Sequence, residues 1–430
     1  MRDTLVAAST VSALLLSLAI LSAGNGLQGT MLGVRAGLEG FNNVWIGVLM
    51  SGYYMGFVVG SFVCQRLVLR VGQIRTFAVL ASLASAAALL HLVSVNDVVW
   101  TVIRFTSGVC YAGLLMVAES WLNQLATPRT RAGLLSVYVM VMMGSWSIGQ
   151  LFLYTADPSG FILFCVVSIF FSLALVPVGL TRTVAPPLPI TSELHLWQLY
   201  RATPVGVLGC LMAGLTMGVL WGLGPSYAKG VGLDESQVVF FMFLAMLGGL
   251  VMQGPIGWLS DRFDRRRVIL AVCLFGALAS GGLLWKEAPP ELLLLFCFLY
   301  GGLTMPVYPL AVAHIGDNTP DAEMISAASG ALLFYGIGAM AGPILAGLAM
   351  GYLGPTGPFM ITTGALLTFY VYARYRISHF ATVVPEAQGD YVPLQGQATV
   401  VALQLDPRTD TDPEALSTAE METAPAGTAV

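Results

Sequence analysis

The chain has 430 residues, of which 57% are hydrophobic and only 10% are charged. Soluble proteins carry about a quarter charged residues, so this composition excludes an ordinary soluble protein and indicates one that spans a lipid bilayer. The formal net charge of −4 is dominated by the region after residue 376, which holds eight of the 23 acidic residues. The remainder is mildly basic, and we expect no nucleic-acid partner.

Apolar runs long enough to cross a bilayer recur along the whole chain. A transmembrane helix needs about 20 predominantly apolar residues, and we identify twelve such runs. The first is interpreted as a retained helix and not as a cleaved signal, because it exceeds the usual signal core of about 7–15 residues. The expected helices are 5–24, 43–63, 74–94, 98–122, 132–154, 160–180, 205–227, 237–259, 268–284, 291–314, 325–350 and 358–375.

The basic residues predict the orientation of these helices, since Lys and Arg accumulate in cytoplasmic loops. With the N-terminus inside, all but four of the 19 basic residues fall on the cytoplasmic side. The exceptions are Arg35, Lys229 and Lys286 on the opposite side and Arg104 within a helix. Both termini are therefore expected in the cytoplasm, and the even number of helices agrees.

A proline-containing stretch divides the chain into two similar halves. We expect a six-helix bundle over 1–180, a cytoplasmic linker over 181–204, a second bundle over 205–376 and a disordered acidic cytoplasmic tail over 377–430. Residues of the same kind recur at an offset of 192 or 193, as in Gly108 with Gly301. Parallel six-helix repeats place a transport site between the halves near the middle of the bilayer.

One charged turn interrupts the apolar pattern of the second half. It reads Gly257-Trp-Leu-Ser-Asp261-Arg262-Phe-Asp264-Arg265-Arg266-Arg267 and joins two expected helices. A weaker copy, Leu69-Arg70-Val-Gly72-Gln-Ile-Arg75, lies 192 residues earlier without the acid. The same turn used twice indicates a duplicated membrane unit.

These motifs resemble those of the major facilitator superfamily. The turn is similar to the family's loop motif G-x-x-x-D-R-x-G-R-R-R, except that Asp264 replaces a glycine, and Arg104-Phe-Thr-Ser-Gly108 is similar to the family's fourth-helix pattern R-x-x-x-G. Glu119-Ser120, followed by Arg129-Thr-Arg131-Ala-Gly133 and Tyr138, resembles the bacterial YcaD-type group of uncharacterised members. The resemblance implies twelve helices in two bundles related by pseudo-symmetry, and it does not imply a particular substrate.

Charged residues near the expected membrane faces are candidates for coupling or gating. Asp261, Arg262 and Arg265 are expected to form a cytoplasmic latch, with Glu323 as a further partner, although a purely topogenic arginine cluster is the alternative. Glu119 is expected to pair with Arg129, Arg131 or the loop that carries Arg70, with proton relay as the alternative.

Arg104 is the most costly residue within the expected membrane region. A charged side chain at the bilayer centre costs about 2.5–3.5 kcal/mol on insertion scales, so it needs a partner or water. The resemblance implies proton coupling or binding of an anionic group for this arginine. Snorkelling toward the membrane surface is the alternative, because Arg104 lies near one end of its expected helix.

Several amide and aromatic side chains fall where a central cavity is expected, although each can instead pack between helices. Together with Arg104, the candidates for substrate binding are Asn25, Gln28, Tyr111, Tyr138, Trp146, Gln150, Trp221, Tyr300, Tyr308 and Tyr335. One arginine, several amides and many aromatic rings suit a modest organic solute better than a bare metal ion.

We therefore expect a monomeric secondary active transporter in the inner membrane of a bacterium, moving a small organic solute with protons as the coupling ion. The direction is open, with a slight preference for efflux. Proton-linked uptake of an organic acid or sugar-like solute is the first alternative, and a non-transporting membrane sensor is the second. The histidines and cysteines are scattered, so no enzyme activity, metal site or cofactor is predicted.

Overall fold

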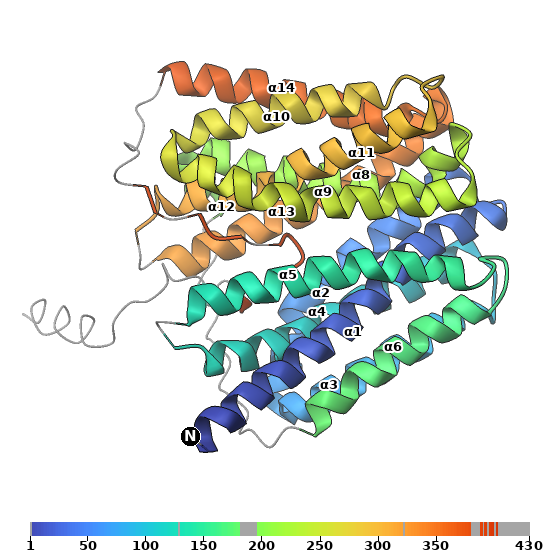
Figure 1. Ribbon diagram of the computed structural model, residues 1–430, viewed down its shortest axis with the longest axis vertical. Coiled ribbons are helices and arrows are strands. Elements are labelled where there is room, and N and C mark those ends of the chain that lie inside the picture. Colours follow the sequence, from blue (N-terminus) through green and yellow to red (C-terminus); the bar gives the residue numbers. More distant parts are fainter. Residues whose placement is uncertain are drawn as a thin grey trace, which may run out of the picture.

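A computed structural model describes residues 2–127, 130–180, 196–320 and 323–379, and in the tail 388–389, 391–393, 395–399 and 401–402. Every regular element in these residues is a helix. Figure 1 shows two groups of helices, the first half of the chain in blue to green and the second half in light green and yellow to orange.

The first half contains six long helices. The bounds are α1 (Arg2–Leu38), α2 (Asn43–Val71), α3 (Gln73–Leu90), α4 (Asp97–Leu125), α5 (Arg131–Leu151) with the short helix η1 (Phe152–Thr155), and α6 (Ile162–Gly179). Asn42 caps α2 by accepting the backbone N–H of Trp45 at 2.9 Å. Helix α1 continues well beyond the predicted end at residue 24 and stops before Gly40, whose positive φ of 78° permits the turn.

The second half repeats this arrangement. The short helix α7 (Leu196–Ala202) precedes α8 (Pro204–Gly230), α9 (Glu235–Arg262), α10 (Arg265–Gly282), α11 (Pro290–Thr304), α12 (Val307–Gly316), α13 (Met324–Leu353) and α14 (Gly357–His379). Helices α11 and α12 form one predicted span that is broken near Pro306. The linker residues 181–195 lie outside the described part of the chain.

Each predicted span has a helical counterpart in the structure. Ten helices of the described chain are long and apolar enough to cross a membrane, with α11 and α12 counted as one. The other two predicted spans, the ninth and twelfth, correspond to α10 and α14, where arginines reduce the apolar character. The α-helical membrane fold predicted from the sequence is confirmed.

Glycines at equivalent positions set the packing within each half. A Cβ atom on Gly108 would lie 2.1 Å from the carbonyl oxygen of Tyr53, so α4 packs backbone-to-backbone on α2. Gly301, at the same place in the second half, approaches the carbonyl oxygen of Ala245 equally closely and joins α11 to α9. Small residues allow such contacts between membrane helices, and their recurrence is the structural form of the sequence repeat.

The two halves touch directly through α2 with α13, α5 with α9 and α1 with α8. A Cβ atom on Gly47 of α2 would lie 2.3 Å from the carbonyl oxygen of Pro343 in α13. Ser51 donates a hydrogen bond to the carbonyl oxygen of Met340 at 2.6 Å. These contacts lie toward the end of the molecule opposite the arginine-rich turn, which we call the arginine-poor end.

At the arginine-rich end, residues of the tail lie between the halves. The sequence predicts disorder from residue 377, whereas α14 continues to His379 and the described residues between 388 and 402 contact both bundles. Figure 1 shows this red segment between α13 and α5. We call the described residues 388–389, 391–393, 395–399 and 401–402 the tail segment.

Candidate functional site

The centre of the molecule holds a small cavity between the halves. It has a volume of about 50 Å³ and is lined by Trp146, Trp221, Tyr308 and Tyr335 among others. Trp146 of α5 and Trp221 of α8 stack across the interface, with ring centroids 5.2 Å apart and an interplanar angle of 23°. Residues Gln395 to Gln397 of the tail segment line the same cavity. Both halves and the tail segment therefore share this aromatic cavity, and its remaining volume is far below that of a typical small-molecule site, about 300–1,000 Å³.

Arg104 of α4 is a buried cation outside the wall of this cavity, and it is linked to the cavity through Tyr53, whose hydroxyl donates to Gln397 of the wall. The Arg104 side chain is 4% exposed, and Nη1 donates a hydrogen bond to Gln28 Oε1 on α1 at 3.0 Å. The guanidinium also lies 4.3 Å from the ring centroid of Tyr53 on α2. With so little exposure the guanidinium is enclosed by the helices of the first half and is not extended along the outer surface, as snorkelling would require.

The surroundings of Arg104 contain amides with unused hydrogen-bonding capacity. Asn25 donates to the Tyr53 hydroxyl at 2.9 Å, and Thr30 donates to Gln150. Four buried atoms have no hydrogen-bond partner among the described residues: Arg104 Nε, Asn25 Oδ1, Gln28 Nε2 and Gln150 Nε2. The ion pairs between described residues do not include Arg104. A buried guanidinium without a carboxylate partner is suited to an anion, since an uncompensated buried charge is costly.

Helix α1 holds this group and the tryptophan pair together. A Cβ atom on Gly26 would lie 2.2 Å from Trp146, and one on Gly29 would lie 3.6 Å from Arg104 Nη2. Positions three apart share one face of a helix, so the cation and the stacked rings lie within about one turn of each other along α1. The glycines leave the space in which both side chains fit.

Glu119 is fully buried at the arginine-rich side of the cavity. The Tyr138 hydroxyl donates to it at 2.5 Å, and Thr399 of the tail segment donates through its backbone N–H, at 3.1 Å to Oε2, and through its hydroxyl. The sequence predicts arginine partners instead. Arg129 lies outside the described residues, and Arg131 begins α5. The prediction missed these neutral donors because one of them comes from a segment expected to be disordered.

The remaining aromatic candidates differ in position. Tyr308 and Tyr335 face the cavity with ring centroids 4.9 Å apart. Tyr111 packs inside the first half against the rings of Tyr53 and Phe57. Tyr300 is buried inside the second half and donates its hydroxyl to the Thr216 carbonyl at 3.0 Å.

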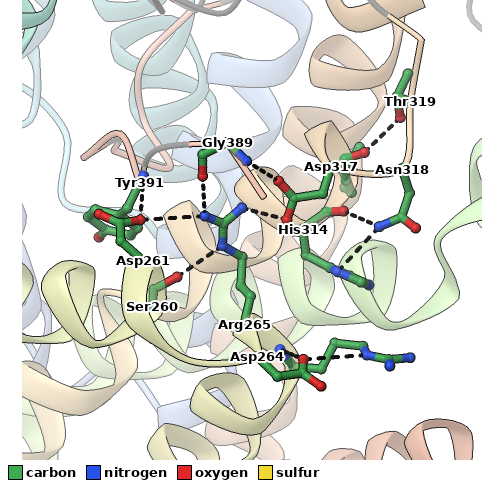
Figure 2. A network of polar contacts seen from close by, with 12 residues as sticks. Ser260, Asp261, Asp264, Arg265, His314, Asp317, Asn318, Thr319, Gly389 and Tyr391 are labelled. Carbon is green, nitrogen blue, oxygen red and sulfur yellow. Dashed lines mark hydrogen bonds and ion pairs between the residues drawn. The ribbon is translucent and has the colours of Figure 1, made fainter. Parts of the chain in front are cut away.

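The charged turn forms a compact network around Arg265, which Figure 2 shows. The Arg265 side chain is fully buried and forms an ion pair with Asp317, at the end of α12, at 2.5 Å. Asp261 lies farther away, at 3.5 Å from Nη2, and its side chain is 38% exposed. Ser260 accepts a hydrogen bond from Nε at 2.9 Å, and the carbonyl of Gly389 accepts one from Nη2 at 2.6 Å. The network therefore joins three helices and the tail segment.

The other predicted latch residues have different roles. Arg262 lies over the Trp258 ring at 4.3 Å, on the exposed surface. Glu323 is exposed where α13 begins, and the carboxylate that meets Arg265 most closely is that of Asp317. Asp264, which departs from the family's glycine, accepts the Arg266 backbone N–H at 3.0 Å and so caps α10. The departure thus has a local structural reason.

Sequence reasoning missed Tyr53, Asp317 and the tail segment. Asp317 carries a weak signal, because it is an acid directly after an apolar run. Tyr53 carries a similarly weak signal, because it lies between Gly52 and Gly56, and such closely spaced glycines indicate a helix face that another helix approaches. The tail segment carries none, because its composition is typical of disordered chains.

A second, larger cavity of about 780 Å³ opens at the arginine-poor end. Residues of both halves line it, including Asp157, Lys229 and Asp234. A backbone N–H from Ser159 donates to Asp157 and lowers the pKa of its carboxyl. Tyr154 donates its hydroxyl to the Ser236 carbonyl at 2.6 Å and so joins the halves beside this cavity.

Comparison with known proteins agrees with this geometry. A family model described as Major Facilitator Superfamily matches residues 4–285 and 206–405. The uncharacterized MFS-type transporter YcaD of Escherichia fergusonii is 30% identical over 312 residues, which cover 71% of this chain and 79% of that protein. An uncharacterized MFS-type transporter of Enterobacter sp. (strain 638) is 30% identical over 311 residues, with the same coverage.

Solved structures share the fold at low identity. The nucleoside transporter NupG has a TM-score of 0.74 at 11% identity, covering 86% of this chain and 100% of that chain. A bacterial homologue of the human lysosomal transporter Spinster, in an inward-facing and occupied conformation, has a TM-score of 0.68 at 14% identity, covering 88% and 98%. Together with the paired bundles and the central cavity, these matches establish that the chain belongs to the major facilitator superfamily and resembles its YcaD-type transporters.

Proposed function

We propose that the chain is a secondary active transporter that moves a small organic anion across the inner membrane of a bacterium by alternating access, with protons as the coupling ion. The single observation that carries the proposal is the buried Arg104, which has no carboxylate partner among the described residues and is linked through Tyr53 to the aromatic cavity between the halves. Intramembrane charges of this kind mark substrate or ion pathways.

The class of solute follows from the groups around the cavity. A carboxylate on the solute would supply the negative charge that Arg104 lacks, and it would accept from the free Nε and from Gln28 Nε2. The stacked pair of Trp146 and Trp221 offers flat apolar surface within one helical turn. A carboxylate attached to an aromatic or other planar body fits both features.

Proton coupling is assigned to Glu119. Its carboxylate is fully buried, and its bonds to Tyr138 and Thr399 are hydrogen bonds from neutral donors. A carboxyl group whose partners among the described residues are neutral donors can gain and lose a proton during the cycle at a modest cost. This assignment takes up proton relay, the alternative to pairing with arginines, and the expected partner Arg129 lies outside the described residues.

The proposed orientation places the arginine-rich end and both termini in the cytoplasm. The halves pack closely where α2 meets α13, they enclose the cavity of about 780 Å³ at the arginine-poor end, and the tail segment lies between them at the other end. A solute path toward the cytoplasm fits this arrangement only when the tail segment is displaced. The direction of transport stays open, with a slight preference for efflux, and the place of the Gly342-Pro343 pair in α13 does not decide it.

Reconstitution into liposomes tests the proposal. Purified protein in vesicles loaded with the pH dye pyranine is offered benzoate-type carboxylates, neutral sugars and quaternary amines in turn, and the passive rate in protein-free vesicles is subtracted because protonated benzoates cross a bilayer unaided. We expect the carboxylates alone to change the internal pH beyond this passive rate, and we expect Arg104→Ala to abolish the difference. Proton movement driven by amines or sugars, or carboxylate-driven movement unchanged in Arg104→Ala, would contradict the assignment. No response to any solute class would favour a sensor.

A further inference from the structure

The tail segment enters the space between the two halves from the arginine-rich end. It contacts α2, α4 and α5 of the first half and α9, α10, α12 and α13 of the second. Five of its residues are at most 5% exposed: Gln397, Ala398, Thr399, Val401 and Ala402. A segment with the composition of a disordered chain is thus enclosed by the bundle.

The first part of the tail segment completes the Arg265 network (Figure 2). Gly389 accepts from Arg265 at 2.6 Å and donates its N–H to Asp317 at 3.0 Å. The N–H of Tyr391 donates to Asp261 at 2.7 Å. Hydrogen bonds to charged groups are the stronger ones, and here the partners of those charges are backbone atoms of the tail segment.

The Tyr391 ring fits against the first glycine of the charged motif. A Cβ atom on Gly257 would lie 2.4 Å from the Tyr391 ring, so the ring occupies space that only glycine leaves open. Burial raises the pKa of the Tyr391 hydroxyl well above its ordinary value, which keeps the ring neutral. Gly257 and Asp261 therefore form one wall of a site for this part of the chain.

The middle of the tail segment occupies the proposed solute cavity. Gln397 accepts a hydrogen bond from the Tyr53 hydroxyl at 3.2 Å, and Gln395 donates to the carbonyl of Val139 at 3.2 Å. Gly396 lies against the Tyr335 ring, where a Cβ atom would meet ring carbons at 2.1 Å. A solute bound at this place and the tail segment would need the same volume.

The last part of the tail segment covers Glu119. Thr399 donates both its backbone N–H and its hydroxyl to this carboxylate. Glu119 is therefore hydrogen-bonded to the same tail segment that fills the space between the halves at the arginine-rich end. A residue that must exchange protons during transport is covered while the tail segment is bound.

We propose that the space between the halves at the arginine-rich end is a binding site for an extended polypeptide, that its ligand is the chain's own tail segment, and that binding inhibits transport. The bound segment excludes solute from the cavity and covers Glu119. It also bonds to Asp261 and Asp317 of the second half and, farther along, to Glu119 of the first, so it fills the space through which the halves would close at this end. Binding of the tail segment and of solute is mutually exclusive, so each lowers the apparent affinity of the other.

The contacts are of a kind that can form and break. Local turns organise the segment, with Ala398 N–H bonded to the Gln395 carbonyl at 3.0 Å and Ala402 N–H bonded to the Thr399 carbonyl at 3.1 Å. All of its other contacts named above are hydrogen bonds or ring packing with the two halves. Release therefore unfolds no helix and requires only the loss of these contacts.

Hydrogen exchange on the full-length protein in nanodiscs tests the binding itself. A segment bound at least about 90% of the time would exchange at least about tenfold more slowly than a free peptide at the amides of Tyr391 and Thr399. Gly396→Val places a side chain into the Tyr335 ring without altering either bundle, and we expect it to restore fast exchange. Gly364→Val is the matched control, because an added side chain there meets open space.

Fast exchange at both amides in the parent protein, or protection that survives Gly396→Val, would overturn the proposed binding site. Neither measurement depends on the proposed transport function. A failure to find a solute therefore leaves this result unaffected.

Accessibility of the cavity tests the inhibition. A Gln253→Cys variant places a cysteine in the cavity, and a maleimide is added from the arginine-rich side. We expect this cysteine to be labelled at least about tenfold faster when Gly396→Val is also present, because a site that is about 90% occupied is open only about a tenth of the time. Cutting the chain after 387 should give the same increase, whereas cutting it after 402 retains the tail segment and should give none. Equal labelling in all of these proteins would refute the inhibitory role.

Discussion

Replacing Asp317 by alanine should destabilise the protein more than the same replacement at Asp261, and its coupling to Arg265 should be the stronger one. Asp317 is 2% exposed in its side chain and lies 2.5 Å from the fully buried Arg265, whereas Asp261 is 38% exposed and lies at 3.5 Å. Removing one partner of a buried ion pair costs about 3–5 kcal/mol, because the other charge is left buried. An exposed pair contributes about 0–1 kcal/mol.

Asp261 has one further contact, because it accepts a hydrogen bond from the N–H of Tyr391. A hydrogen bond to a charged group contributes at most about 1.5–3 kcal/mol to stability. The free energy of unfolding in mixed micelles, titrated with SDS, measures both effects. A double-mutant cycle with Arg265→Ala isolates each pair, and we expect a coupling energy above about 2 kcal/mol for Asp317 and below about 1 kcal/mol for Asp261. A coupling energy for Asp261 equal to or larger than that for Asp317 would refute this interpretation of the network.

Three further changes give distinct outcomes. Gly47→Val should lower the free energy of unfolding by at least about 1–3 kcal/mol, because its Cβ would lie 2.3 Å from the Pro343 carbonyl oxygen. Gly351→Val, where an added Cβ meets open space, is the control, and equal unfolding free energies for the two variants would contradict the expectation. Tyr138→Phe removes the hydroxyl that donates to Glu119 at 2.5 Å, and it should lower the free energy of unfolding by about 1.5–3 kcal/mol in the same assay. An unchanged free energy would show that this hydrogen bond does not stabilise the protein. Glu119→Gln replaces one acceptor oxygen by an NH₂ group that faces Thr399, and we expect the backbone amide of Thr399 to exchange its hydrogen about tenfold faster. Unchanged exchange would show that the tail segment is held mainly by its other contacts.

The sequence predicted the membrane fold well because its signals are local and strong. Runs of apolar residues report bilayer-spanning helices one at a time, and the structure contains a helix for each of them. The repeat was also readable, since Gly108 and Gly301 have equivalent contacts. Even α10, whose three arginines lower its apolar character, was located by the apolar residues that follow them.

The partners of the polar residues could not be predicted in the same way. The sequence identified Arg104, Glu119 and Arg265 as special, because charge is rare in such a chain. Choosing their partners requires knowing which helices are neighbours and how they are rotated. Asp317, 52 positions from Arg265, is one case. Thr399 is a stronger one, because it lies 280 positions from Glu119 in a segment whose composition predicts disorder.

Carboxylate-driven flux in proteoliposomes containing three versions of the full-length protein tests the central claim most directly. If Arg104 binds the solute and the tail segment competes for the same cavity, Gly396→Val should transport faster than the parent protein, and Arg104→Ala should not transport at all. The initial rate of internal pH change gives this order. Equal rates in all three proteins, or a Gly396→Val protein slower than its parent, would contradict the account.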